Sequence, residues 1–379
     1  MTTLKLSPGE TEILNSFLVT GNKCHTARDL GVSRRRVRNA IASAEKKGHV
    51  PWLSPAPKPD HLEMCKTTVQ YDAKGDVIQE WRRLIPAAQE MEDFVEGLCE
   101  RVKGKGKAKR RAPKKTDGGE ILFEIDIFDP HVGMYADERE TLDSNYDCDI
   151  AAKRMVAAAE DLASRARRPK KCVLVFGGDV MHADSRSNKT EHAGNVLDVD
   201  TRYQRVVQYI IAASRDVVKI AAAIADEVEL VILKGNHSWH SECWLAQVLN
   251  AYYSECDNIT VRIDRSPRSA LTWGDNLIVW AHGDRVPASK WPMVIAAEYA
   301  KEWGATKYRY LRAGHIHSQK TIAPVIVQEQ SGIIVEFCPA LCPSDAWHSE
   351  SGYVGSQRGA AAVEYHKSKG RITSLFHVV

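Results

Sequence analysis

The chain has 379 residues, of which 44% are hydrophobic and 27% charged, with a formal net charge of +3. These values exclude a fibrous or disordered protein, and the length allows two or three domains. No apolar run reaches the roughly 18 residues of a membrane span, and the first residues lack the apolar core of a secretory signal. Nine cysteines without a C-x-x-C pair indicate a reducing compartment, so we expect a cytoplasmic protein without membrane contact.

The charge is unevenly distributed along the chain. Residues 1–118 carry a net charge of +8, and residues 119–379 carry −5. A basic region attracts polyanions such as nucleic acids, whereas a region rich in carboxylates suits metal ions. We therefore expect a polyanion to bind the N-terminal part.

Three short helices are predicted in residues 1–50. Ser7 and Glu10 have the spacing of a capping box at the start of the first helix. A second helix ends at Gly31, and Ser33 caps the third, which continues to about residue 48.

The second and third helices resemble a helix-turn-helix DNA-binding domain. Small Ala27 allows close helix packing, Gly31 makes the turn, and Val37 packs the third helix into the core. Four arginines of that helix are expected to contact phosphates or guanine edges: Arg34, Arg35, Arg36 and Arg38. The alternative is a three-helix bundle that binds protein.

Two further segments separate this domain from the rest. Residues 60–102 are predicted to form a β-hairpin followed by a helix. Residues 103–118 form a basic linker, which either follows DNA phosphates or is simply flexible.

From residue 119 onward, short apolar strands alternate with helices. The strands are expected at 121–128, 171–178, 229–235 and 277–282, with helices at 149–168 and 201–224. Nearly continuous apolar strands between helices indicate a sheet that is covered on both faces. We therefore predict one α/β domain over residues 119–379. Strands at 333–337 and 361–366 extend the sheet or form a cap, and the loop 343–358 either lines a substrate groove or packs there.

Aspartate, asparagine or histidine follows each of these first four strands and also ends a fifth apolar run, YLRAGHIH (310–317). These residues are Asp129, His131, Asp179, His182, Asn236, His237, His282, His315 and His317. The carboxyl ends of strands in α/β sheets form binding sites, so the side chains should converge. Mixed oxygen and nitrogen ligands suit Mn²⁺, Fe²⁺ or Zn²⁺, and two such ions that share a carboxylate can bind and polarise a phosphoryl group.

The ordered blocks DPH, GD, GNH, H and GHIH resemble the signature of the calcineurin-like metallophosphoesterase superfamily. The resemblance covers residues 120–320 and implies a four-layer αββα sandwich. It implies a first metal ion at Asp129, His131 and His317, and a second at Asn236, His282 and His315. Asp179 would bridge both ions. His237 would protonate the leaving group or stabilise the transition state. Two divalent ions are expected, with Mn²⁺ favoured over Fe²⁺, Zn²⁺ or Mg²⁺.

Two positions depart from the common family pattern. His182 replaces an aspartate in the block GDVMH, which resembles the branch of DNA double-strand-break repair nucleases. His182 is therefore a second candidate catalytic residue. Ser238 replaces the acidic residue after His237, which usually orients that ring, and Glu242 and Asp284 are the candidates to substitute for it.

The favoured function is a DNA phosphodiesterase, an exonuclease or endonuclease that uses a metal-bridging hydroxide on DNA delivered by the helix-turn-helix. The alternative is a phosphomonoesterase that acts on nucleotides, DNA ends or phosphoproteins. A DNA-binding regulator with a decayed metal site is a third hypothesis. The domain combination resembles bacteriophage DNA metabolism, which would place the protein in the host cytoplasm. A homodimer is one of the assemblies that the sequence allows.

Overall fold

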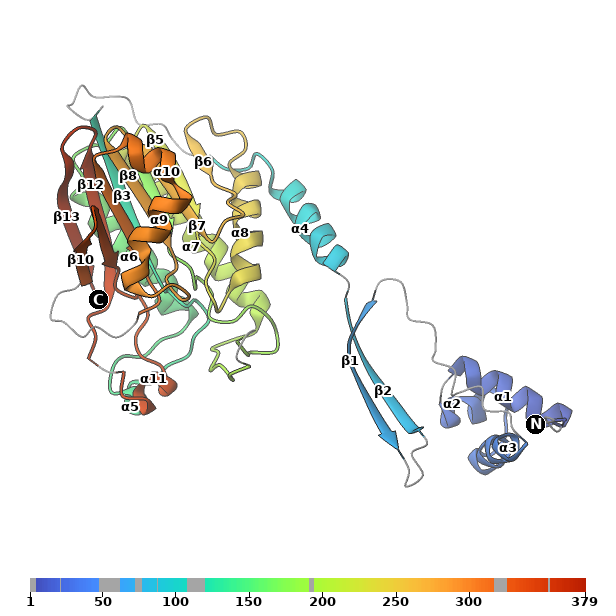
Figure 1. The fold of residues 1–379 in the computed structure, drawn as a ribbon. Helices are drawn as coiled ribbons and strands as arrows, with labels where there is room; N and C mark the ends of the chain where they lie inside the picture. Colours follow the sequence, from blue (N-terminus) through green and yellow to red (C-terminus); the bar gives the residue numbers. More distant parts are fainter. Residues whose placement is uncertain are drawn as a thin grey trace. The chain divides into compact units, whose positions relative to one another are not determined.

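The structure, a computed structural model, describes residues 5–20, 22–47, 62–71, 77–86, 88–107, 120–190, 194–316, 326–353 and 355–379. The chain divides into two compact units, Met1–Glu92 and Asp93–Val379, each described by itself (Figure 1). None of the helices in these ranges is long and apolar enough to span a bilayer.

Three helices form the first part of the N-terminal unit. They are α1 (Pro8–Thr20), α2 (Lys23–Asp29) and α3 (Arg34–Lys46). The predicted capping box is present, because Glu10 N–H donates to Ser7 Oγ at 3.3 Å and Ser7 N–H donates to Glu10 Oε2 at 2.7 Å. The helices enclose a small core of Ile13, Leu14, Ala27, Val37, Ala40, Ile41 and Ala44.

The turn between α2 and α3 depends on Gly31. Its φ is +61°, a left-handed conformation that costs other residues about 1 kcal/mol or more. Val37, on the inner face of α3, is fully buried, and the four arginines of α3 are exposed. The turn therefore fixes how α3 packs on the other two helices.

Replacing Gly31 with alanine should destabilise the three helices by about 1 kcal/mol. Hydrogen–deuterium exchange of the α2 and α3 amides in the full chain measures the change. Gly9→Ala is the matched control, since Gly9 lies in α1 with negative φ and a Cβ there would meet only the Arg36 guanidinium at 3.9 Å. Faster exchange in both variants would show that the turn has no special role.

The predicted hairpin and its helix are also present. Strands β1 (Leu62–Tyr71) and β2 (Val77–Pro86) pair antiparallel, and α4 spans Ala88–Val102. Of the predicted basic linker only residues 103–107 are described. They are bound to α8 (Trp239–Tyr252) and the turn after it, because Gly104 N–H donates to Ala251 O at 2.9 Å and Gly106 N–H donates to Tyr252 O at 2.7 Å.

The C-terminal unit contains two sheets. The six-stranded sheet has the order β13-β12-β3-β4-β5-β6, and β3 to β6 are parallel. Its strands are β3 (Ile121–Ile127), β4 (Lys171–Phe176), β5 (Glu227–Ile232), β6 (Ile259–Val261), β12 (Gly359–His366) and β13 (Gly370–Val378). The five-stranded sheet has the order β10-β11-β9-β8-β7. Its strands are β7 (Arg268–Trp273), β8 (Asn276–Ala281), β9 (Tyr308–Ala313), β10 (Ile326–Gln330) and β11 (Ile333–Phe337).

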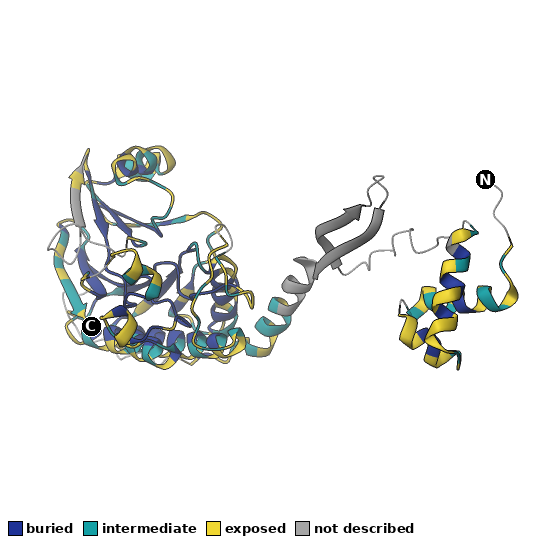
Figure 2. Ribbon diagram, turned by 90° about the horizontal axis from the view of Figure 1, so that it is seen from below, coloured by how far each residue is buried: buried dark blue, intermediate teal, exposed yellow. Residues whose placement is uncertain are grey.

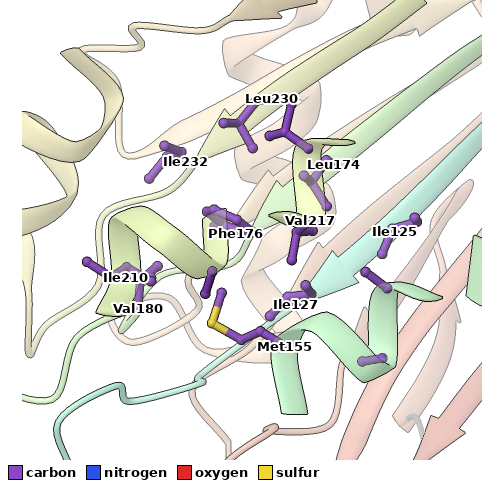
Figure 3. Packing of buried hydrophobic residues seen from close by; sticks show 14 of the residues in the cluster. Ile125, Ile127, Met155, Leu174, Phe176, Val180, Ile210, Val217, Leu230 and Ile232 are labelled. Carbon is purple, nitrogen blue, oxygen red and sulfur yellow. The ribbon is translucent and has the colours of Figure 1, made fainter. Parts of the chain in front are cut away.

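Helices cover the outer face of each sheet. Against the six-stranded sheet pack α6 (Cys148–Ser164), α7 (Tyr203–Ile224) and α8, and Figure 3 shows the contact of Met155 and Val217 with side chains of that sheet. Against the five-stranded sheet packs α9 (Trp291–Glu298), followed by α10 (Ala300–Ala305). The remaining short helices are α5 (Glu138–Thr141), η3 (Ala288–Lys290) and α11 (Ala346–Glu350).

A third apolar cluster lies between the sheets and joins Leu122 and Val173 of one to Ile278 and Trp280 of the other. The unit therefore has four layers, helices–sheet–sheet–helices, and the buried strands lie inside them (Figure 2). This confirms the predicted α/β class with two sheets.

Candidate metal centre

The predicted site residues follow strands whose carboxyl ends lie at one edge. In one sheet β3, β4 and β5 are parallel neighbours, and in the other β8 and β9 are. Backbone hydrogen bonds join the loops after these strands. His131 N–H donates to Asp179 O at 3.0 Å, and Gly314 N–H donates to His282 O at 2.8 Å. These bonds hold the loops of each sheet together, and His315 N–H, which donates to Asp129 Oδ2 at 2.9 Å, joins the two sets of loops.

Asp179 is at the centre of the cluster. Its Oδ2 lies 3.2 Å from His282 Nε2 and 3.9 Å from His131 Nε2. His282 Nε2 also lies 3.0 Å from Asn236 Oδ1, while its Nδ1 lies 3.0 Å from the Gly177 carbonyl oxygen. When Nδ1–H donates to that carbonyl, the lone pair of Nε2 faces two oxygen acceptors. Three acceptor atoms that converge in this way fit a shared cation.

Two groups of potential ligands share Asp179. Each group keeps its ligand atoms within 4.8 Å of one another. One group is Asp129, His131 and Asp179, and the other is Asp179, His282 and His315. Neighbouring ligands of one ion lie about 3 Å apart, because metal–oxygen and metal–nitrogen bonds are about 2.0–2.2 Å long. The donors therefore fit two adjacent divalent ions.

The acid and the base at the centre stabilise each other's charge. Burial alone would raise the pKa of Asp179, but His282 and His237 hold it well below its usual range. Burial alone would lower the pKa of His282, but Asp179 raises it to about 10. In the protein without metal, a proton on His282 thus balances the Asp179 carboxylate.

The backbone around the site is strained. Four predicted ligands have positive φ: Asp129 (49°), His131 (41°), Asp179 (48°) and His315 (66°). Such conformations persist where the surroundings enforce them and are concentrated at functional sites. A Cβ on Gly235 would overlap Asp179, and one on Gly178 would lie 2.5 Å from His282 Nδ1. The close approach of these loops therefore requires glycine.

The two predicted catalytic histidines lie side by side at this centre. The rings of His182 and His237 are stacked with centroids 5.4 Å apart, and His182 Nδ1 lies 3.2 Å from His131 Nδ1. His237 N–H donates to Asp179 Oδ1 at 2.7 Å, and its Nδ1 lies 3.0 Å from the His182 carbonyl oxygen. The ring of His237 is therefore oriented by a backbone carbonyl and not by a carboxylate.

Glu242 has a different role from the one that the sequence suggested. Its buried carboxyl accepts hydrogen bonds from Val180 N–H at 2.9 Å, Ser238 Oγ at 2.8 Å and Gly235 N–H. Burial and the nearby Asp179 raise its pKa to about 8. Glu242 thus ties the loop after β4 to the loop after β5. Asp284, the other candidate, pairs with its neighbour Arg285 at 3.2 Å.

One predicted ligand cannot be placed, and other polar residues close to the motifs in sequence lie elsewhere. His317 is outside the described residues. Asp184 caps α8 by accepting from His240 N–H and Ser241 N–H, both at 2.7 Å. Asp126 belongs to a buried ion cluster with Arg312 between the sheets. The exposed arginines of α3 are in the N-terminal unit, whose position relative to this centre is not determined.

One acid–base pair at the centre was not singled out from the sequence. Asp345 Oδ1 lies 2.6 Å from His348 Nδ1 and also accepts from His348 N–H at 2.8 Å. Burial is the main cause, and His237 the second, that lowers the pKa of His182 to about 3. The Asp345 carboxylate favours the protonated ring and so partly offsets this lowering. The start of α11 therefore lies within electrostatic reach of His182. The sequence favours a surface or packing role for His348, because no motif of the strand ends includes it.

Comparison with known proteins gives distant similarity only. No protein-family model and no curated protein match the chain. Among solved structures, a predicted phosphoesterase of Streptococcus pneumoniae has 9% identity and a TM-score of 0.28, over 68% of this chain and 98% of that one. Vps29 of Chaetomium thermophilum has 11% identity and a TM-score of 0.29, over 68% and 97%. A single mutant of Vps29 from Entamoeba histolytica has 12% and 0.26, over 68% and 99%.

Proposed function

We propose that this protein is a two-metal-dependent phosphoesterase that hydrolyses DNA phosphodiester bonds. The observation that carries the proposal is the pair of ligand groups that share Asp179, with His282 Nε2 facing Asp179 Oδ2 and Asn236 Oδ1. A bridging carboxylate with neutral histidine and asparagine ligands is the donor set that a pair of divalent ions needs on a phosphate ester. The resemblance of the ordered motifs to calcineurin-like phosphoesterases supports the same chemistry.

The candidate ligands would bind the two metal ions, and a separate residue would transfer the proton. Asp129, His131 and Asp179 would hold one ion, and Asp179, Asn236, His282 and His315 the other. Bound ions would neutralise the phosphate and lower the pKa of a coordinated water. The stiff, buried loops fix the ligands before substrate arrives, so little reorganisation opposes the reaction.

His237 would act on the leaving oxygen. It is half-buried, next to the ligands, and its Nδ1 can donate to the His182 carbonyl. That hydrogen bond fixes the ring so that Nε2 is the nitrogen that can transfer a proton. The buried His182 would keep its ring against His237 and His131 and so position both.

DNA is the proposed substrate because of features outside the ligand set. His182 stands where the repair-nuclease branch has histidine, and four exposed arginines lie on α3 of a helix-turn-helix-like unit. Arginines on one helix supply sequence-independent phosphate contacts, whose contribution falls as salt concentration rises.

The test is cleavage of labelled single- and double-stranded DNA with Mn²⁺, beside an aryl phosphomonoester. The expected result is Mn²⁺-dependent DNA cleavage. Arg34→Ala/Arg35→Ala should weaken DNA binding several-fold at low salt and reduce its salt dependence, because two phosphate contacts are lost. The exposed lysine variant Lys219→Ala on α7 is the control. Rapid hydrolysis of the phosphomonoester without DNA cleavage would contradict the nuclease proposal and indicate a phosphatase.

A further inference from the structure

An exposed aromatic cluster stands in the segment after β11. Trp347 is 57% exposed and Tyr353 is 44% exposed, although both are large aromatic side chains. Their ring centroids are 5.7 Å apart with an interplanar angle of 31°, and the His348 ring lies 5.1 Å from Trp347. We call Trp347 and Tyr353 the aromatic platform. Neighbouring aromatic rings left open to solvent are a common mark of a binding surface.

The platform is built on an ordered support. Asp345 caps α11, and its carboxylate also holds the ring of His348. Tyr353 N–H donates to His348 O at 2.8 Å, which closes the turn after the helix. Ser344 Oγ donates to Tyr353 O at 3.3 Å. The backbone that carries both rings is therefore fixed before any ligand binds, which reduces the entropy cost of binding.

The same segment is attached to the metal centre. Leu341 N–H donates to Phe128 O at 3.0 Å, and Cys342 N–H donates to Asp129 O at 3.2 Å. Asp345 follows three residues later, and its carboxylate interacts electrostatically with the buried His182. The helix α11 lies beside α5, so both helices are at one end of the unit (Figure 1). The platform is thus carried by a segment whose start is hydrogen-bonded to the loop of the candidate ligand Asp129.

We propose that the aromatic platform stacks an unpaired nucleobase of the strand whose phosphate enters the metal centre. This inference rests on the proposed function and narrows its substrate class to single-stranded DNA or frayed DNA ends. Indole and phenol faces bind any base, because every base has a π-face, whereas a base inside a duplex has that face covered. A phosphopeptide would instead need an exposed cationic side chain for its phosphate, whereas this segment has the Asp345 carboxylate at the start of α11 and its Arg358 is buried.

The experiment compares the kcat/KM of the whole chain, assayed with Mn²⁺, on two single-stranded substrates. One is a thymidine octamer, and the other is an octamer of abasic tetrahydrofuran phosphates with the same backbone. The kcat/KM ratio of the thymidine substrate to the abasic one should fall about 10-fold or more in Trp347→Ala/Tyr353→Ala. Trp347→Phe should keep the ratio, since a phenyl ring still stacks. Met293→Ala, an exposed apolar side chain of α9, is the control.

Binding of the same octamers without turnover is the second readout. The wild type should bind the thymidine octamer more tightly than the abasic one, and the double variant should lose that difference. An unchanged preference in the double variant would overturn the stacking inference, as would an equal loss on both substrates. If the wild type cleaves double-stranded DNA but neither octamer, the proposed function stands and the inference fails. If it cleaves no DNA at all, the proposed function fails, and the binding difference alone decides the inference.

Discussion

Replacing Asp179 with asparagine is expected to reduce Mn²⁺-dependent phosphodiester cleavage by about 10³-fold or more. Asp179 is the one residue common to both ligand groups and is 1% exposed. An amide has the size of the carboxylate but no charge, so two adjacent cations would repel each other without compensation. His282, whose pKa Asp179 raises to about 10, would also lose its stabilising anion.

Metal content separates this explanation from simple unfolding. The purified variant should bind fewer than two Mn²⁺ per chain while its circular dichroism spectrum stays like that of the wild type. Asp216→Asn is the matched control, because that carboxylate is exposed on α7 and its ion pair with Lys219 at 2.7 Å is on the surface. Full activity in Asp179→Asn would exclude the bridging role and with it the two-metal assignment.

The architecture of the C-terminal unit could be predicted because its strands are apolar almost throughout. In β3 all seven residues are buried, and five of the seven in the run ILFEIDI are apolar, which is typical of a strand covered on both faces. The predicted strands at 121–128 and 171–178 end one or two residues earlier in the structure, at Ile127 and Phe176. The reason is that the following residues form the loops that carry the candidate ligands.

The sequence predicted which residues form the candidate site, but not the hydrogen bonds that hold them in place. Parallel strands place their carboxyl ends together, so Asp179 and His282 were expected to meet although 103 positions separate them in the sequence. Nothing in the sequence indicated that Glu242 joins two loops, since that depends on which backbone N–H groups lack other partners. The orientation of His237 by a carbonyl was equally hidden, because every residue has a carbonyl group.

The alternation of side chains along β3 explains why Asp126, although close in sequence to the candidate ligand Asp129, lies away from the metal centre. Phe123, Ile125 and Ile127 face the helices, so Glu124 and Asp126 face the other sheet. There Arg312 of β9 donates from Nε to Asp126 Oδ2 at 2.9 Å and lies 3.1 Å from Glu124 Oε1. It also donates to Glu336 of β11. A carboxylate only three residues from a candidate ligand is therefore part of the support of the fold.

Arg312→Met is expected to destabilise the C-terminal unit by about 3–5 kcal/mol. Arg312 is 2% exposed, and its removal leaves three buried carboxyl groups, of which Glu336 keeps its ion pair with Arg371. Burial alone would raise the pKa of Glu336, but the two arginines lower it. The difference between wild type and variant should be largest at pH 8. It should shrink toward pH 5, because protonation then removes the unpaired charge in the variant.

Denaturant unfolding followed by tryptophan fluorescence, with buried Trp280 between the sheets, measures the effect. Arg165→Met should cost no more than about 1 kcal/mol, because its pair with Asp161 at 2.6 Å is on the surface. Adding Asp126→Asn and Glu336→Gln to Arg312→Met should recover part of the loss, since no desolvated carboxylate then remains at these two positions. If Arg312→Met costs no more than Arg165→Met, water reaches the cluster, and the two sheets are joined by their apolar contacts alone.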